Sequence, residues 1–252
     1  MINIKSQWEL DRMRQSGQVA AEVLDDLARA LKPGAATIWL DKKAEGLIKS
    51  KGAESAFLGY HGYPRNICIS INEEVVHGIG TVRRIKEGDI VSLDVGVKFG
   101  GYVGDVAATF PAGRISDEKS DLIETASAAL AAGIEQARVG RRLYDISAAI
   151  QKTAEEAGYS VVRDYVGHGI GMEMHEDPQV PNYGRAGTGP LLRAGMVLAI
   201  EPMLVMGKAE VEVSRDSWTV ITRDRMPAAH FEHTVAITED GPEILTCLKT
   251  DR

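Results

Sequence analysis

Residues 90–110 constrain the fold of this chain more than any other stretch. Two apolar, β-rich runs flank the segment Lys-Phe-Gly-Gly at 98–101, a pattern typical of a β-hairpin. With the turn centred on residues 99 and 100, Asp94 faces Asp105. Opposed residues have Cβ atoms about 4.5–5.5 Å apart, and like charges there repel each other. A bound dication would offset that repulsion, and the alternative is a hairpin whose carboxylates lie in water.

The composition favours one large globular unit. The chain has 252 residues, of which 44% are hydrophobic and 26% charged, enough for a sizeable core. A net charge of −7 without a basic block argues against a nucleic-acid surface. We expect no membrane span and no signal peptide, because the apolar runs are too short for either. Only Cys68 and Cys247 are present, so we expect a cytoplasmic protein without a disulfide framework.

Apolar periodicity predicts the same order of elements twice. In the first half, a capping box at 6–9 opens a helix, Thr37 is expected to cap a second helix, and strands follow from 67 to 111. In the second half, helices begin at Ser116 and near 143, and strands are expected at 161–162, 196–205, 210–222 and 231–238. This order indicates a duplicated α+β architecture in one compact unit, with halves at about 1–112 and 113–252.

Two more carboxylates lie inside apolar strands of the second half. Glu201 interrupts the run 196–205, and buried charges are normally paired or metal-bound. The alternative for Glu201 is a strand end, since Pro202 can terminate a ladder. Alternation places Glu232 on the same strand face as His230 and Thr234.

Histidines in glycine-rich surroundings add candidate ligands. His168 lies between glycines, and His175 follows it seven positions later. Four strand carboxylates and one histidine would make an oxygen-rich site that suits Mn²⁺, Fe²⁺, Co²⁺ or Zn²⁺ in a two-metal cluster. Two metals about 3.5–4 Å apart can activate water and polarise a carbonyl, which is hydrolase chemistry.

Several local motifs connect the chain to one family. From about Ser6 to about Leu245, it resembles the methionine aminopeptidases of peptidase family M24 in their short, type I form. The motifs include Gly-Tyr-His-Gly-Tyr-Pro at 59–64, Gly-His-Gly-Ile-Gly at 167–171, Ala-Ile-Glu-Pro at 199–202 and Phe-Glu-His-Thr at 231–234. The resemblance implies the α+β pita-bread fold, with duplicated halves around a pseudo-two-fold axis.

The resemblance also implies a role for each matching residue. Asp105 and Glu232 would bridge two divalent ions (Co, Mn, Fe or Zn), Asp94 would be bidentate on one ion, and His168 and Glu201 would complete the other. Glu201 would also act as general acid/base, and His77 and His175 would bind the scissile amide and the oxyanion. The residues matching the methionine pocket are Tyr60, Tyr63, Cys68, His77 and Trp218.

The implied activity is removal of the N-terminal methionine from nascent polypeptides, preferring a small second residue. The implied partners are nascent chains, with docking near the ribosomal exit tunnel as a hypothesis and a monomer as the default state. An X-Pro aminopeptidase or prolidase is one alternative, although those relatives carry an extra N-terminal domain. A catalytically dead peptide-binding module is the other.

Three positions depart from the family pattern. Phe57 stands where a small residue or cysteine is frequent, Met174 where an aromatic is common, and His230 where glutamine is frequent. The first two bear on the shape of the methionine pocket. His230 is a candidate hydrogen-bond donor that orients a ligand carboxylate.

Overall fold

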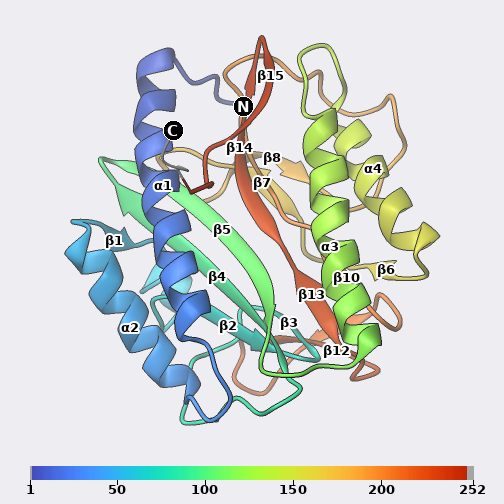
Figure 1. Ribbon diagram of the computed structural model, residues 1–252. Helices are drawn as coiled ribbons and strands as arrows, with labels where there is room; N and C mark the ends of the chain where they lie inside the picture. The colour runs from blue at the N-terminus through green and yellow to red at the C-terminus, as the bar shows by residue number, and fades with distance from the viewer. Residues whose placement is uncertain (1, 249–252) are drawn as a thin grey trace.

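A computed structural model describes residues 2–248 and has the α+β composition expected from the sequence (Figure 1). Its helices are α1 (Gln7–Ala30), α2 (Thr37–Ser50), the short 3-10 helix η1 (Tyr60–Gly62), α3 (Asp117–Gln136) and α4 (Leu143–Glu156). Strands of the first half are β1 (Glu54–Ser55), β2 (Cys68–Ile71), β3 (Glu74–Val76), β4 (Ile90–Phe99) and β5 (Tyr102–Pro111). Those of the second half are β6 (Ser160–Val161), β7 (Gly167–Gly169), β8 (Glu176–Val180), β9 (Val197–Ile200), β10 (Met203–Val205), β11 (Val211–Val213), β12 (Val220–Thr222), β13 (Ala228–His230), β14 (Glu232–Thr238) and β15 (Gly241–Ile244).

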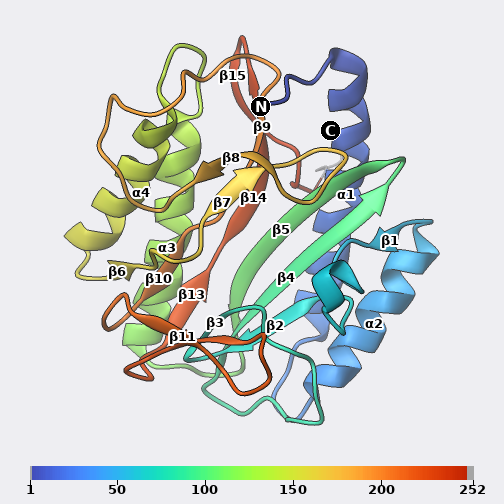
Figure 2. The same ribbon diagram turned by 180° about the vertical axis from the view of Figure 1, so that it is seen from behind.

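A nine-stranded sheet organises the molecule. Its order is β1-β4-β5-β14-β9-β7-β8, with β2 paired to β4 and β15 paired to β14. Helices α1 and α2 lie beside the half that contains β4 and β5, and α3 and α4 lie beside the half that contains β14 and β9 (Figures 1 and 2). None of the helices within residues 2–248 combines the length and apolar character that a bilayer crossing requires.

Strand β4 alternates between a core face and a polar face. Val91, Leu93 and Val95 pack into the apolar cluster beneath α1 and α2. Ser92 and Asp94 point to the opposite side, since successive residues of a strand face opposite ways. The side away from the helices is therefore where polar chemistry can be assembled.

The starts of three helices test the predicted caps. Ser6 caps α1 in a full capping box with Glu9, and Ser116 caps α3 by accepting from the amide of Lys119. The prediction for Thr37 was wrong, because Ala36 is the N-cap and Thr37 is the first helical residue of α2. Its hydroxyl instead donates to the carbonyl of Thr81 and accepts from the amide of Thr81, which ties the start of α2 to the loop between β3 and β4.

The hairpin forms as expected, but its predicted register was wrong. Asp94 pairs with Ala107, and Asp105 pairs with Gly96. The turn residues are Gly100 and Gly101, both with positive φ (60° and 88°), as a tight two-residue hairpin turn requires. Shifting the turn by one residue slides the pairing by two, so both aspartates stay on one face as diagonal neighbours.

The strands expected at 196–205 and at 231–238 are each modified at a functional carboxylate. Strand β9 ends at Ile200, Glu201 and Pro202 lie outside any strand, and β10 begins at Met203. Strand β14 begins at Glu232, and the single residue Phe231 separates it from the short strand β13. Both carboxylates thus lie at strand boundaries, Glu201 directly after β9 and Glu232 as the first residue of β14.

Candidate metal centre

Five neighbouring strands bring the predicted ligands together. The sheet order β4-β5-β14-β9-β7 places Asp94, Asp105, Glu232, Glu201 and His168 in sequence across the sheet, with Glu201 directly after β9. The hydroxyl of Thr234 donates to the carbonyl of Asp105 and accepts from its amide, which locks β5 to β14 at this point. Residues far apart in the chain therefore share one rigid platform.

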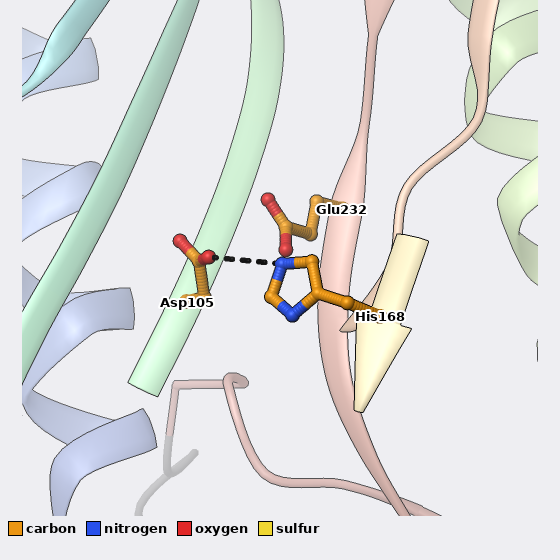
Figure 3. Close-up of side chains that lie close together, drawn as sticks. All are labelled: Asp105, His168 and Glu232. Atoms are coloured by element: carbon orange, nitrogen blue, oxygen red, sulfur yellow. Dashed lines mark ion pairs between the residues drawn. The ribbon is translucent and has the colours of Figure 1, made fainter. Parts of the chain in front are cut away.

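Three ligand atoms form the tightest group of this cluster. Asp105, His168 and Glu232 each offer one atom, and these atoms all lie within 4.8 Å of one another (Figure 3). The Nε2 atom of His168 lies 4.0 Å from Asp105 Oδ2 and 3.5 Å from Glu201 Oε1. These separations are too long for direct hydrogen bonds but leave room for a cation between the groups.

The tautomer of His168 supports a cation site. Its Nδ1 atom lies 2.9 Å from the carbonyl oxygen of Gly169, and a carbonyl can only accept, so Nδ1 carries the hydrogen. Burial, together with the nearby His175, lowers the pKa of His168 to about 3, so the ring is neutral. The lone pair on Nε2 then faces carboxylate oxygens, an arrangement that a metal ion would satisfy.

The carboxylates themselves are buried and incompletely paired. Asp105 and Glu232 are 3% and 2% exposed, and one oxygen of each, like Oδ1 of Asp94, has no hydrogen-bond partner among the described residues. Burial raises the pKa of Asp105 to about 7. Burial and repulsion from neighbouring carboxylates raise the pKa of Asp94, Glu201 and Glu232 well above the usual range. Divalent ions fit these residues, because they would offset both the repulsion and the lost hydration.

Neutral imidazoles surround the carboxylates. The hydroxyl oxygen of Tyr60 lies 2.7 Å from Nδ1 of His175, whose ring centre is 4.2 Å from that of His168. Burial, with a smaller contribution from His175, lowers the pKa of His77 to about 4. Burial also lowers the pKa of His175.

His230 and His168 approach different oxygens of the Glu201 carboxylate. The Nε2 atom of His230 is 3.8 Å from Glu201 Oε2, and neither of its ring nitrogens has a hydrogen-bond partner among the described residues. Burial, with a smaller contribution from His77, lowers the pKa of His230 to about 3. The carboxylate nearest to the neutral ring is therefore Glu201, at a distance too long for a hydrogen bond, and the role of His230 in orienting a ligand carboxylate stays a prediction.

The cluster forms the floor of one cavity of about 200 Å³. Tyr63 and Trp218 form part of its wall, with ring centres 5.2 Å apart and edge-to-face. Burial and the Asp94 charge raise the pKa of the Cys68 thiol, which keeps it neutral. All the candidate site residues named from the sequence line this cavity, namely Tyr60, Tyr63, Cys68, His77, Asp94, Asp105, His168, His175, Glu201, Trp218 and Glu232.

Three further residues line the cavity. Phe57 and Met174, the two departures from the family pattern, both contribute to the wall. His61 was not predicted. Its signal in the sequence was its place between Tyr60 and Gly62 in a glycine-rich loop, where it adopts a positive φ of 48°.

Buried carboxylates and an imidazole beneath an apolar-walled cavity define a metallohydrolase. The family model for "Metallopeptidase family M24" matches residues 11–239, and the chain belongs to this family. Within it, the chain belongs to the methionine aminopeptidases, which are metal-dependent hydrolases.

Similarity to individual relatives extends over full lengths. The chain is 53% identical to the methionine aminopeptidase of Clostridium acetobutylicum, over 98% of this chain and 99% of that one. It is 50% identical to methionine aminopeptidase 1 of Bacillus subtilis, with the same coverage. The crystal structure of the methionine aminopeptidase from Rickettsia prowazekii superimposes with a TM-score of 0.96 at 43% identity, covering 98% of this chain and 100% of that one.

A more distant structure shares the fold. Prolidase from Pyrococcus furiosus superimposes with a TM-score of 0.80 at 26% identity, over 99% of this chain but only 66% of the prolidase. The fold is thus the pita-bread α+β fold that the resemblance implied.

Proposed function

We propose that this enzyme removes the N-terminal methionine from peptides and nascent polypeptides, with a preference for a small second residue. The observation that carries the proposal is a single cavity with a carboxylate–imidazole floor and an aromatic, thiol-bearing wall. The floor suits hydrolysis, and the wall suits a flexible thioether, which gains from contact between sulfur and aromatic rings. The names of the full-length relatives agree with this substrate.

Two divalent ions of the Mn²⁺, Fe²⁺, Co²⁺ or Zn²⁺ group are proposed as cofactors. The residues that would hold them are Asp94, Asp105, His168, Glu201 and Glu232. When bound, the ions supply Lewis-acid activation of the attacking water and of the scissile carbonyl. Support comes from the buried carboxylate oxygens that lack hydrogen-bond partners and from the lone pair on Nε2 of His168. These atoms are all electron-pair donors, and a cation would neutralise the charge that they place on the cavity floor.

Glu201 is proposed as the general acid/base. Its carboxylate takes a proton from the attacking water, whose oxygen forms the new bond to the carbonyl carbon. That proton then passes to the amine nitrogen as the C–N bond breaks. Burial and the charges of Asp105 and Asp94 raise the pKa of Glu201, which suits a group that must hold a proton for part of the cycle.

His77 and His175 are proposed to bind the scissile amide and the developing oxyanion. Both imidazoles line the cavity, and their lowered pKa values keep them neutral. A neutral, preorganised donor stabilises an oxyanion by several kcal/mol without adding charge to the ground state.

The cellular setting and the organisation of the chain are also proposals. The two free cysteines fit a reducing cytoplasm, where the enzyme would act as a monomer on nascent chains near the ribosomal exit tunnel. Halves at about 1–112 and 113–252 would form a pseudo-symmetric pair within a single catalytic domain. Crosslinking to translating ribosomes tests the docking, and labelling without enrichment near the exit tunnel would contradict it.

Peptide hydrolysis with defined metal tests the proposed activity. The protein is stripped with a chelator, reloaded with Mn²⁺, Fe²⁺, Co²⁺ or Zn²⁺ in turn, and assayed on Met-Ala-Ser, Met-Leu-Ser and an X-Pro peptide. We expect metal-dependent methionine release from Met-Ala-Ser, slower release from Met-Leu-Ser, and none from the Asp94→Ala variant. Hydrolysis of the X-Pro peptide alone would point to a prolidase. Bound metal without turnover would point to a peptide-binding module.

A further inference from the structure

The segment before α1 reaches the loop that carries His175. The backbone amide of Lys5 donates to the carbonyl of Gly195 (2.7 Å), which fixes the segment against the end of the sheet. The Nζ atom of Lys5 lies 2.5 Å from Oε2 of Glu176, and Nδ2 of Asn3 donates to the same oxygen (2.9 Å). Glu176 is the first residue of strand β8.

The ion pair between Lys5 and Glu176 is buried. The two side chains are only 5% and 9% exposed, unlike the other lysine–glutamate pairs of the described residues. The backbone of Gly171 closes another side, where an added Cβ would come within 2.4 Å of Glu176 Oε1 and 2.8 Å of Lys5 Nζ. Although burial raises the pKa of Glu176, hydrogen bonds from Lys5 and Asn3 hold it below the usual range. The enclosed charges therefore depend on each other.

This pair anchors the chain next to a cavity residue. Glu176 directly follows His175, whose Nδ1 is held by the hydroxyl of Tyr60 at 2.7 Å. Upstream in the loop, the carbonyl of Gly171 accepts from the amide of Val103 in β5 (2.8 Å). The backbone that follows His175 is held by the pairing of Glu176 with Gly169, and Lys5 adds a contact to the Glu176 side chain from outside the cavity.

We propose that Lys5 is a positioning residue for the reaction, which acts through its buried ion pair with Glu176 to hold the imidazole of His175 against the scissile amide. The inference rests on the proposed function of His175. Lys5 itself does not line the cavity, so its effect passes entirely through the backbone of the loop. Misplacing a preorganised hydrogen-bond donor by about 1 Å can cost up to about 100-fold in rate.

The first test compares Lys5→Met with the wild type in full steady-state kinetics on Met-Ala-Ser, with metal titrated by calorimetry. We expect kcat to fall about 10- to 100-fold, while KM and metal affinity stay within about twofold. Lys5→Arg, which keeps the charge, is expected to recover part of kcat. Lys51→Met is the matched control, because Lys51 pairs with Glu22 at the same 2.5 Å but between α1 and α2, and we expect no change in kcat.

A double variant separates positioning from stability. Lys5→Met leaves a buried carboxylate without its lysine, so the single variant is expected to unfold at a lower temperature. Adding Glu176→Gln removes that charge, and we expect the Tm to recover while kcat stays low. Hydrogen exchange provides a second readout that needs no turnover, with faster exchange of the Lys5→Met variant confined to residues 171–180.

Each outcome bears on the proposal. Recovery of kcat together with Tm in the double variant would overturn it, because the pair would then serve stability alone. An unchanged kcat in Lys5→Met, or equal losses in kcat, KM and metal affinity, would overturn it as well. Absence of methionine release by the metal-loaded wild type would instead overturn the proposed function, so the two failures are distinguishable.

Discussion

Strand β4 has two faces made from alternating residues, and they contribute differently to the protein. Leu93 and Val95 lie on the face beneath α1 and α2, fully enclosed by apolar side chains. Asp94, between them in the sequence, points the other way, and its Oδ1 has no hydrogen-bond partner among the described residues. Burial stabilises the first face and destabilises the second until a cation is bound. One strand can thus divide stability and activity between odd and even positions.

The largest effect is expected on the polar side, at Glu201. The change Glu201→Gln keeps the shape of the side chain but replaces the carboxylate with an amide, which cannot take up a proton at this pH. We expect kcat to fall about 10²- to 10⁴-fold. The metal-free protein should be no less stable than the wild type, because a buried charge with a raised pKa is removed. Steady-state kinetics and thermal unfolding measure the two quantities.

Glu239→Gln is the control for this change, since Glu239 is exposed and follows the end of β14. A variant at Glu201 that retains more than about a tenth of wild-type kcat would remove Glu201 from the proposed proton transfer.

The next effect is expected on the apolar face, at Leu93. Its side chain is 0% exposed, so Leu93→Ala should lower the free energy of unfolding by about 2–5 kcal/mol. Urea denaturation measures this change, with Lys98→Ala, an exposed position of the same strand, expected within about 0.5 kcal/mol of the wild type. The folded fraction of the Leu93→Ala protein should keep its kcat. A large loss of kcat per folded molecule would show that the two faces are coupled.

The smallest effect concerns pH and metal. The pKa of Asp105 is raised to about 7, so its contribution to the stability of the metal-free protein is fully present below pH about 4 and is lost as the pH rises towards 7. Metal binds to the ionised carboxylates, so bound metal offsets the stability that the metal-free protein loses as the pH rises. We expect the gain in Tm on adding metal to increase between pH 5 and pH 8 by at least about 3 °C.

Differential scanning calorimetry at matched ionic strength measures this increase. The Asp105→Asn variant should show a smaller dependence of the metal effect on pH over the same range, because only Asp94, Glu201 and Glu232, whose pKa values are also raised, still have to ionise. A gain in Tm that falls as the pH rises would contradict the raised pKa of Asp105.

Local pattern predicted which face each residue takes, but less well how strands align. Alternation placed Asp94 and Asp105 on one face correctly, whereas their direct opposition was wrong because the turn uses Gly100 and Gly101. The register of a two-residue hairpin depends on which residues can adopt positive φ, and the Gly-Gly pair at 100–101 indicates the correct turn. The strand end at Glu201 was foreseen as an alternative to burial. The structure has both, since β9 ends there and the side chain is only 14% exposed.

Assembly across the sheet lay beyond local pattern. The order β4-β5-β14-β9-β7, which gathers the cavity floor, depends on long-range pairing that periodicity does not encode. The resemblance to the methionine aminopeptidases predicted that the residues of the cavity floor would lie together, before the fold was known. Neither source indicated Thr37 bridging to Thr81 or Lys5 reaching Glu176, because such contacts depend on where loops pass in space.

The ion pair between Lys5 and Glu176 has a consequence for how the enzyme folds during its synthesis. The two residues are 171 positions apart, and chains are synthesised at about 5–20 residues per second. Lys5 is therefore added to the chain roughly ten to thirty seconds before Glu176. During that interval α1 can begin to form, but the loop at His175 does not yet exist. The segment around Lys5 thus waits for its final contact until the second half of the chain is made, and the catalytic face is completed late in biosynthesis.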